Sequence, residues 1–402
     1  MKQFKTRHIL LIIALCGLMS NCLGVLYNVA GLYFNSIAAD FGVGRGDVSV
    51  AHTIASLGCA VGGILGAKAA KSGRFKRIVL ICTCLFAGGT ALLSMTHSLL
   101  PMYVLSAIRG IGAGTAGTVL VAITINNWFT GSVGLLTSLI FCSAGISGAI
   151  LSPILSSVIE RAGWRTGYLV MAAFIVLFYL PALLFPVGVR PEDAGFEPTM
   201  LGGSEKKKQV FVQPADGPLD PILFVLVLIY ACIASCATSY IPHFSGIADS
   251  YGHTAAVGSA MVSSAMISNT FGKLAYGAVT DRIGIRKGVW IWGTLVAAGT
   301  LMMMRVHGTA ALYVAAFLVG LCYSLSSVGT ALLSRDMFNK ENYAKAYPTI
   351  NMLNTAANAA ITSIIGFMYD ASGNYNGALM LLLGGMLVLM ACSTLAYARQ
   401  KA

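Results

Sequence analysis

The chain has 402 residues, of which 57% are hydrophobic and only 10% charged, and its mean hydropathy is +0.79. Soluble proteins carry about 25% charged residues, so this charged fraction is too small to keep such an apolar chain in water. The composition therefore excludes a soluble enzyme, a DNA-binding domain and a secreted disulfide scaffold, and it predicts membrane-spanning helices.

The net charge of +12 would suggest a nucleic-acid partner in a soluble protein. In a membrane protein it has a different explanation, because the loops on the cytoplasmic side collect Lys and Arg. We therefore expect a lipid bilayer as a partner and no nucleic acid. The ten cysteines lie inside apolar runs without metal-ligand spacing, so we expect no metal and no cofactor.

Twelve apolar runs predict twelve membrane spans. The first run follows Lys2, Lys5 and Arg7; it is too long for a signal peptide and shows no clear cleavage site, so it is assigned as a span. In chain order the runs lie at residues 9–34, 48–67, 78–95, 99–126, 133–158, 166–187, 221–244, 255–279, 289–304, 310–333, 347–369 and 377–397.

One long polar stretch, residues 188–219, divides the spans into two groups of six. We expect an N-terminal six-helix bundle over 1–187, a cytoplasmic linker over 188–219 and a C-terminal six-helix bundle over 220–402. The halves repeat each other at an offset near 210 residues: Gly66 and Gly73 after span 2 match Gly277 and Gly284 after span 8, and residues 160–164 match 370–374. Parallel six-span repeats with a site near the bilayer midplane at their interface are typical of transporters.

The distribution of Lys and Arg predicts the orientation. With both termini on one side, that side carries twenty Lys and Arg residues and the other only four, namely Arg45, Arg161, Arg165 and Arg305. The positive-inside rule then predicts cytoplasmic termini, and we expect the plasma (inner) membrane.

The loop after span 8 reads Gly277-Ala278-Val279-Thr280-Asp281-Arg282-Ile283-Gly284-Ile285-Arg286-Lys287. The corresponding first copy is degenerate, with Ala70 in the acidic position. Span 4 carries Arg109-Gly110-Ile111-Gly112-Ala113-Gly114. Over essentially the whole chain these features resemble the major facilitator superfamily. The resemblance implies an all-α integral membrane protein of twelve transmembrane helices in two pseudo-symmetric six-helix bundles. It also implies a conformational role for the loop motifs, whose residues here are Gly66, Gly73, Arg74, Gly277, Asp281, Arg282, Gly284 and Arg286.

Three further motifs are similar to the monocarboxylate-porter and oxalate/formate-antiporter group: Asn127-Trp128-Phe129, Asn269-x-x-Gly272-Lys273, and residues 190–195. In that group the position of Lys273 usually bears an arginine that meets the substrate carboxylate. The lysine that the oxalate exchanger has in span 11 is missing here, where Asn351, Asn354 and Asn358 stand instead. The resemblance therefore favours small carboxylates other than oxalate.

Arg109 and Lys273 are the only charges well inside the predicted spans, and no Asp or Glu lies at comparable depth. Such buried cations usually mark a pathway or a ligand, and an uncompensated positive site favours an anion. Two structural alternatives stay open. Arg109 could bind backbone carbonyls between helices, and Lys273 could extend to the cytoplasmic interface.

Polar residues inside the spans complete the candidate site. Asn351 and Asn354 lie on one face of span 11 with Tyr347, Asn358 and Thr362, and this face could line a cavity or bond to neighbouring helices. The same two interpretations apply to the remaining candidate substrate contacts, which are Asn269, Tyr27, Asn28, Tyr240 and Tyr323. His243 is a candidate for proton coupling, against the alternative of an interfacial hydrogen-bonding residue.

These patterns predict a secondary active transporter, either symporter or antiporter, of small organic anions, with monocarboxylates as the expected class. A coupling proton or counter-anion would drive alternating access. The alternative is a facilitator-type uptake or efflux transporter for a drug or a sugar. We expect a monomer and no enzymatic activity, because no nucleophile, base or metal cluster is evident.

Overall fold

The computed structural model describes residues 6–131, 133–192, 199–201, 218–306 and 308–400. Its contacts divide the chain into two compact units, Met1–Lys206 and Lys207–Ala402. The division falls inside the segment 188–219 that the sequence suggested as a linker. Most of that segment, including Lys206, lies outside the described residues.

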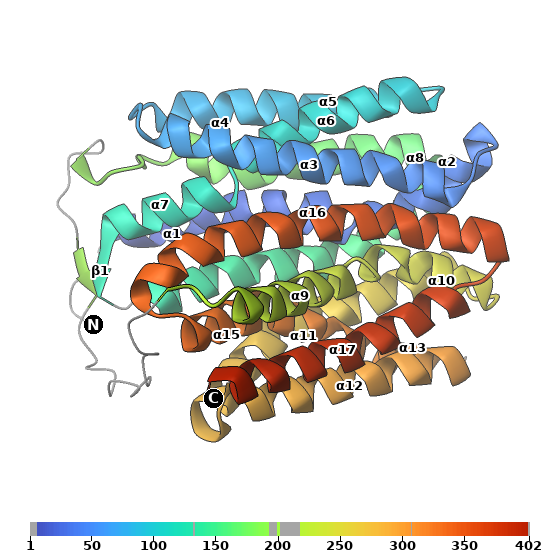
Figure 1. Ribbon diagram of the computed structural model, residues 1–402. Helices are drawn as coiled ribbons and strands as arrows, with labels where there is room; N and C mark the ends of the chain where they lie inside the picture. The colour runs from blue at the N-terminus through green and yellow to red at the C-terminus, as the bar shows by residue number, and fades with distance from the viewer. Residues whose placement is uncertain (1–5, 132, 193–198, 202–217, 307, 401–402) are drawn as a thin grey trace. The chain divides into compact units, whose positions relative to one another are not determined.

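Unit 1 is built from long helices, several of which are interrupted (Figure 1). Two short strands, β1 (Phe129–Gly131) and β2 (Thr199–Leu201), pair in parallel. The helices of unit 1 are α1 (Thr6–Met19), η1 (Ser20–Asn28), η2 (Ala30–Tyr33), α2 (Phe34–Phe41), α3 (Arg45–Ala70), α4 (Phe75–Thr83), η3 (Cys84–Gly88), α5 (Gly89–Leu93), α6 (Leu99–Thr115), α7 (Thr118–Trp128) and α8 (Val133–Leu184).

Unit 2 has the same kind of architecture, with a short broken stretch at α14 and η6. Its helices are α9 (Pro221–Thr238), η5 (Ile241–His243), α10 (Phe244–Ser250), α11 (Ala255–Ile283), α12 (Ile285–Arg305), α13 (Thr309–Gly320), α14 (Cys322–Ser324), η6 (Leu325–Gly329), α15 (Thr330–Met337), α16 (Lys340–Ser372) and α17 (Asn376–Gln400).

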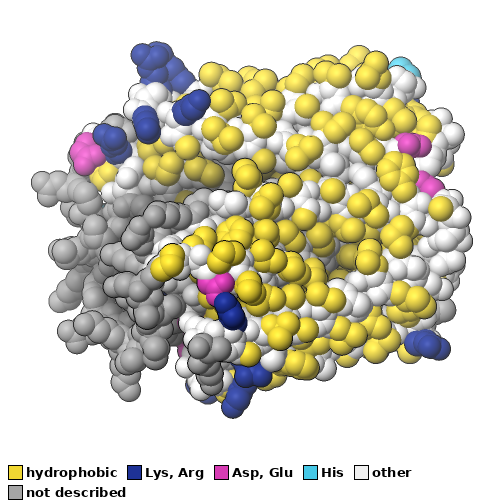
Figure 2. All heavy atoms as spheres, viewed as in Figure 1, with side chains coloured by type: hydrophobic (Ala, Val, Ile, Leu, Met, Phe, Trp, Pro, Cys, Tyr) yellow, Lys and Arg dark blue, Asp and Glu magenta, His cyan; other side chains and the backbone are white. Residues whose placement is uncertain are grey.

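Eight helical segments among the described residues are long and apolar enough to cross a membrane. One of them, Leu139–Leu184, holds two helices, because Gly163 breaks α8 with φ 81° and ψ 162°. Adding α11, α12 and α16 gives the predicted twelve long helical stretches. Figure 2 shows hydrophobic side chains along the lengths of the helices, with Lys and Arg toward their ends.

Backbone geometry repeats between the two units. All described residues with positive φ are glycines, and they form three pairs at offsets of 210 or 211 residues: Gly42 with Gly252, Gly73 with Gly284, and Gly163 with Gly373. Glycine adopts this region without the steric cost that a Cβ imposes. The two units therefore turn the chain at equivalent places, as the sequence repeat predicts.

Glycines bring α3 and α6 into close contact in unit 1. A Cβ at Gly58 or Gly62 would collide with the backbone of α6, and a Cβ at Gly110 or Gly114 would collide with the backbone of α3. Small residues spaced by four allow this approach, which van der Waals packing stabilises where lipid offers no hydrophobic drive. This contact fixes the backbone of α6 at Gly110, next to Arg109.

The two ends of unit 1 differ in charge. At one end, Trp128 donates from Nε1 to the Gly188 carbonyl over 2.9 Å, and the His8 ring packs 6.4 Å from the Trp128 ring. The basic turn between α3 and α4 lies at this end, because Arg74 and Gly188 line one cavity.

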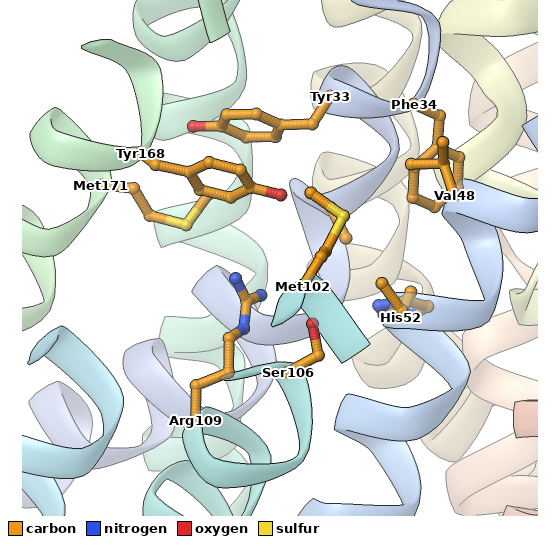
Figure 3. A pocket seen from close by; sticks show the side chains of 11 residues that line it. Tyr33, Phe34, Val48, His52, Met102, Ser106, Arg109, Tyr168 and Met171 are labelled. Atoms are coloured by element: carbon orange, nitrogen blue, oxygen red, sulfur yellow. The ribbon is translucent and has the colours of Figure 1, made fainter. Parts of the chain in front are cut away.

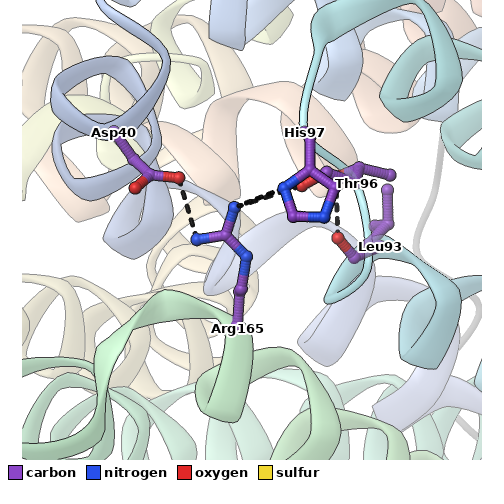
Figure 4. Close-up of polar contacts among 5 residues, drawn as sticks. All are labelled: Asp40, Leu93, Thr96, His97 and Arg165. Carbon is purple, nitrogen blue, oxygen red and sulfur yellow. Dashed lines mark hydrogen bonds and ion pairs between the residues drawn. The ribbon is translucent and has the colours of Figure 1, made fainter.

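At the other end of unit 1, Arg165 joins three elements (Figure 4). Its guanidinium pairs with Asp40 Oδ2 at 2.8 Å and donates to the Thr96 carbonyl at 3.3 Å and to His97 Nδ1 at 3.4 Å. The Asp40–Arg165 pair is about one-third exposed, so it contributes little by itself and acts as one member of a network.

We expect Gly62→Ala to destabilise the protein by about 1–3 kcal/mol, because the new methyl group meets the α6 backbone at Ile111 and Thr115. Gly63→Ala is the matched control, since its Cβ would lie 3.4 Å from the Val119 side chain, an ordinary contact. Thermal unfolding of both variants in detergent measures the difference. Equal melting temperatures for the two variants would show that the α3–α6 contact does not depend on the missing side chain.

Candidate functional site

Arg109 is the centre of the candidate site in unit 1. It lies on α6 with only 5% of its surface exposed. Its guanidinium carbon is 6.0 Å from the ring centroids of both Phe86 and Tyr168, a distance at which cation–π attraction operates. Among the described residues, no carboxylate pairs with it, and it makes no hydrogen bond to a backbone carbonyl. The carbonyl-binding alternative is thus not observed.

Tyr168 lies over the guanidinium, and Tyr33 stacks on the far face of Tyr168 (Figure 3). The rings of Tyr33 and Tyr168 are 4.2 Å apart between centroids and tilted by only 9°. Burial of the Tyr33 hydroxyl leaves it without a hydrogen-bond partner among the described residues, and the Nε of Arg109 is unpartnered as well. The Tyr33 hydroxyl points away from the guanidinium, toward Gly167 of α8 (Figure 3).

The cavity beside Arg109 has a volume of about 20 Å³. In this conformation it is large enough for about one water molecule. Its lining is mostly apolar and aromatic, with few polar groups, and consists of Ala30, Tyr33, Phe34, Val48, Ala51, His52, Met102, Ser106, Arg109, Tyr168 and Met171. An anionic group of a ligand could satisfy Arg109 here only if the lining side chains moved apart.

The candidate site in unit 2 centres on Lys273 of α11. Its ammonium nitrogen lies 5.8 Å from the ring centroid of Tyr323, which belongs to α14. One helical turn earlier, Asn269 is buried, and its Oδ1 has no hydrogen-bond partner in the described part of the chain. The hydroxyls of Ser268 and Ser324 are also buried without partners there, and both lie near Gly272. The structure thus brings Lys273 together with Tyr323 and places Asn269 on the same helix.

Other predicted contact residues are engaged in helix packing. The Asn28 amide donates to the Ala144 carbonyl at 3.0 Å, and the Tyr240 hydroxyl donates to the Ala378 carbonyl at 2.7 Å. Tyr27 packs edge-on against His52, with centroids 5.6 Å apart. These contacts are what the packing interpretation expects.

His243 is buried in η5, and its Nε2 lies 3.0 Å from the Thr362 carbonyl oxygen. A carbonyl oxygen only accepts, so this ring nitrogen must carry a hydrogen. The contact ties η5 to α16 and matches the hydrogen-bonding alternative for His243.

The asparagines of α16 do not share one environment. Asn351 is exposed, Asn354 is buried and accepts from Thr355 at 3.3 Å, and Asn358 donates to the Ser235 carbonyl and to Thr238 Oγ1 of α9. Asn358 therefore joins two helices.

The two copies of the loop motif have the same backbone turns but differ in how their glycines pack. A Cβ at Gly66 would collide with the Thr115 carbonyl, whereas at Gly277 the equivalent space is open among the described residues. Gly73 and Gly284 have φ of 65° and 86°. The charged members Arg74, Asp281, Arg282 and Arg286 are all exposed at helix ends.

The residues that sequence reasoning missed are Tyr33, Tyr168, Ser106 and His52. They come from four different elements: Ser106 lies on α6 one turn before Arg109, and the other three meet Arg109 only through tertiary packing. No periodic pattern along the chain connects them. The charge of Arg109 inside an apolar run was the one sequence signal that pointed to this cavity.

Comparison with known proteins indicates the family of this chain. The model of the Major Facilitator Superfamily matches residues 9–248 and 223–402. Multidrug resistance protein D of Escherichia coli (strain K12) is 23% identical over 178 residues, and this match spans 44% of each protein.

Solved structures share the fold. A point mutant of the nucleoside transporter NupG superimposes with a TM-score of 0.75 at 13% identity, covering 97% of this chain and all of that one. A bacterial homologue of the human lysosomal transporter Spinster, in its inward-facing and unoccupied conformation, has a TM-score of 0.68 at 14% identity, covering 100% of this chain and 98% of that one. At these identities the likeness concerns the fold alone.

If Arg109 is kept for a ligand, its removal should not weaken the fold. We expect Arg109→Met to unfold at the same temperature as the wild type or higher, because methionine fills the volume without a buried charge. Thermal unfolding in detergent without added anions measures this. A loss of more than about 2 kcal/mol would assign Arg109 a structural role instead.

Proposed function

This chain belongs to the Major Facilitator Superfamily, and on that basis we propose that it is a secondary active transporter of small organic anions, with monocarboxylates as the substrate class. The family identifies it as a multi-pass membrane transporter of small solutes rather than an enzyme. The substrate class is our inference from the charges of the two candidate sites.

The observation that carries the proposal is the isolated charge of Arg109. A buried guanidinium without a carboxylate partner among the described residues is costly, and a bound anion would remove that cost. Arginine presents a planar fork that matches both oxygens of a carboxylate.

Lys273 supplies the corresponding cation in unit 2. Its ammonium contacts the face of Tyr323, and the attraction of an aromatic ring for a cation is weaker than that of a carboxylate. The unpartnered Oδ1 of Asn269 can accept a hydrogen bond from a hydroxyl group of the substrate. A small hydroxylated carboxylate would contact both groups.

In the proposed cycle the substrate is exposed alternately to the two sides of the membrane. A co-transported proton or an exchanged anion would each keep the charge on the site balanced. We place the protein in the plasma (inner) membrane with cytoplasmic termini. The collection of basic residues at one end of unit 1, near Trp128 and Gly188, supports this orientation.

A second candidate function is the efflux of an amphipathic drug-like solute. It is favoured by the match to multidrug resistance protein D and by the aromatic and methionine lining beside Arg109. Methionine and aromatic walls adapt to varied apolar ligands. An anionic drug would use the same cation, so the two functions differ in the size and apolarity of the best substrate.

Uptake of labelled short carboxylates into reconstituted vesicles tests the proposal. We expect Arg109→Gln and Lys273→Gln each to reduce transport about tenfold or more, because each removes a charge-assisted hydrogen bond. Lys273→Arg should retain transport with altered substrate preference or pH dependence, whereas Lys273→Met should abolish it.

Arg305→Gln, which removes an exposed cation at the end of α12, is the matched control and should transport like the wild type. Unchanged carboxylate uptake in both the Arg109 and Lys273 variants would rule out the anion proposal. Export of an apolar solute by those same variants would favour the second candidate.

Orientation is tested by labelling single cysteines in a cysteine-free background with an impermeant reagent. We expect Arg190→Cys to be reached only from the cytoplasm and Glu160→Cys only from outside, because these exposed residues are predicted to lie on opposite sides. Labelling of Arg190→Cys from outside intact cells would reverse the orientation.

A further inference from the structure

A basic notch lies at one end of unit 1, away from Arg109. Its cavity of about 460 Å³ is lined by Gly73, Arg74, Phe75, Lys76, Arg77, Pro186, Val187 and Gly188. We call this set of residues the basic notch. Gly73 and Arg74 also belong to the loop motif to which the family resemblance gives a conformational role, but neither candidate substrate site uses the notch.

The notch is held in shape from both sides. Gly73, with φ 65°, turns the chain from α3 into α4, and the buried ring of Phe75 anchors the start of α4. On the opposite wall, Trp128 donates to the Gly188 carbonyl and Asn127 donates to the Val189 carbonyl at 3.1 Å. The Asn127-Trp128 motif thus acquires a structural role, which is to fix the wall of the notch.

The charge of the notch is not compensated within the described part of the chain. Arg74, Lys76 and Arg77 are exposed, and none of them forms an ion pair there. Residues 68–77 contain five cations and no acid. The equivalent residues 278–287 of unit 2 contain three cations and Asp281, a net charge of +2. This difference in charge between the two turns arises in part because Ala70 stands at the position that is equivalent to Asp281.

The notch lies at the level where lipid head groups are expected. One helical turn along α4 from Lys76 and Arg77, Leu80 and Ile81 are 53% and 59% exposed. A turn of helix rises about 5.4 Å, so the cations lie just beyond the apolar surface that would contact acyl chains. A ligand with a phosphate head and acyl chains would contact both surfaces.

We propose that the basic notch binds the phosphate of an anionic phospholipid head group. Arg74, Lys76 and Arg77 supply the charge, and the first backbone N–H groups of α4 point toward the same end of the helix. The acyl chains lie along Leu80 and Ile81 on the exposed face of α4. A free phosphate ion would share the cations but not this apolar contact.

The test uses the full-length protein in bilayers of phosphatidylglycerol and phosphatidylcholine in equal amounts. Native mass spectrometry measures which lipid remains bound to the protein after the protein is released from the bilayer. We expect the triple variant Arg74→Gln/Lys76→Gln/Arg77→Gln to lose the preference for phosphatidylglycerol by about tenfold or more, since each cation near an anionic head group contributes several-fold.

The matched control is Arg282→Gln/Arg286→Gln/Lys287→Gln, which removes three exposed cations from the equivalent turn of unit 2. It should keep the preference. Trp128→Phe, which keeps an aromatic ring but removes the donor to Gly188, should weaken the preference only partly, because the cations remain while the wall loosens.

Three results would overturn the proposal. Equal losses in the two triple variants would mean a general surface charge effect, and no loss in the notch variant would mean that the notch holds no lipid. Complete displacement of phosphatidylglycerol by millimolar inorganic phosphate would identify a free-phosphate site instead.

Discussion

The close contact between α3 and α6 is the interaction on which the rest of unit 1 depends. In a bilayer, helices gain little from burying apolar side chains against each other, so their association depends on how closely the backbones can pack. Gly58, Gly62, Gly110 and Gly114 permit this approach from both helices. Because α6 is held in this way, the neighbouring Arg109 points into the space covered by Tyr33 and Tyr168.

In the proposed function, Arg109 gives the site its preference for an anion. Its guanidinium lies beside the rings of Phe86 and Tyr168, which attract a cation only weakly, and we propose that an anion binds it more strongly. The cavity beside it is much smaller than typical ligand sites, so the described conformation keeps the cation from bulk water. Binding must then separate the tyrosines from Arg109 or open the cavity toward His52 and Met102.

Much of the fold could be predicted from the sequence because its signals are local. Apolar runs of about 20 residues defined the spans, and glycine-rich turns defined the repeat. The short helices η2, α2 and α10, and the breaks at η1, η3 and η6, could not be predicted, because they depend on how neighbouring helices pack. Arg109 and Lys273 stood out because charge inside an apolar run is rare. By contrast, the roles of Asn28, Tyr240 and Asn358 depend on backbone carbonyls of distant helices, which no local pattern reveals.

The three pairs of positive-φ glycines bear on how the two halves of the chain can differ in sequence and still follow the same path. At Gly42 and Gly252, and at the two other pairs, a side chain would strain the backbone, so few replacements are tolerated there. Charged surface positions carry no such restriction. The two halves therefore share their turns although one carries Ala70 where the other carries Asp281. Divergence of function between the halves would then proceed through charge, with the path of the chain unchanged.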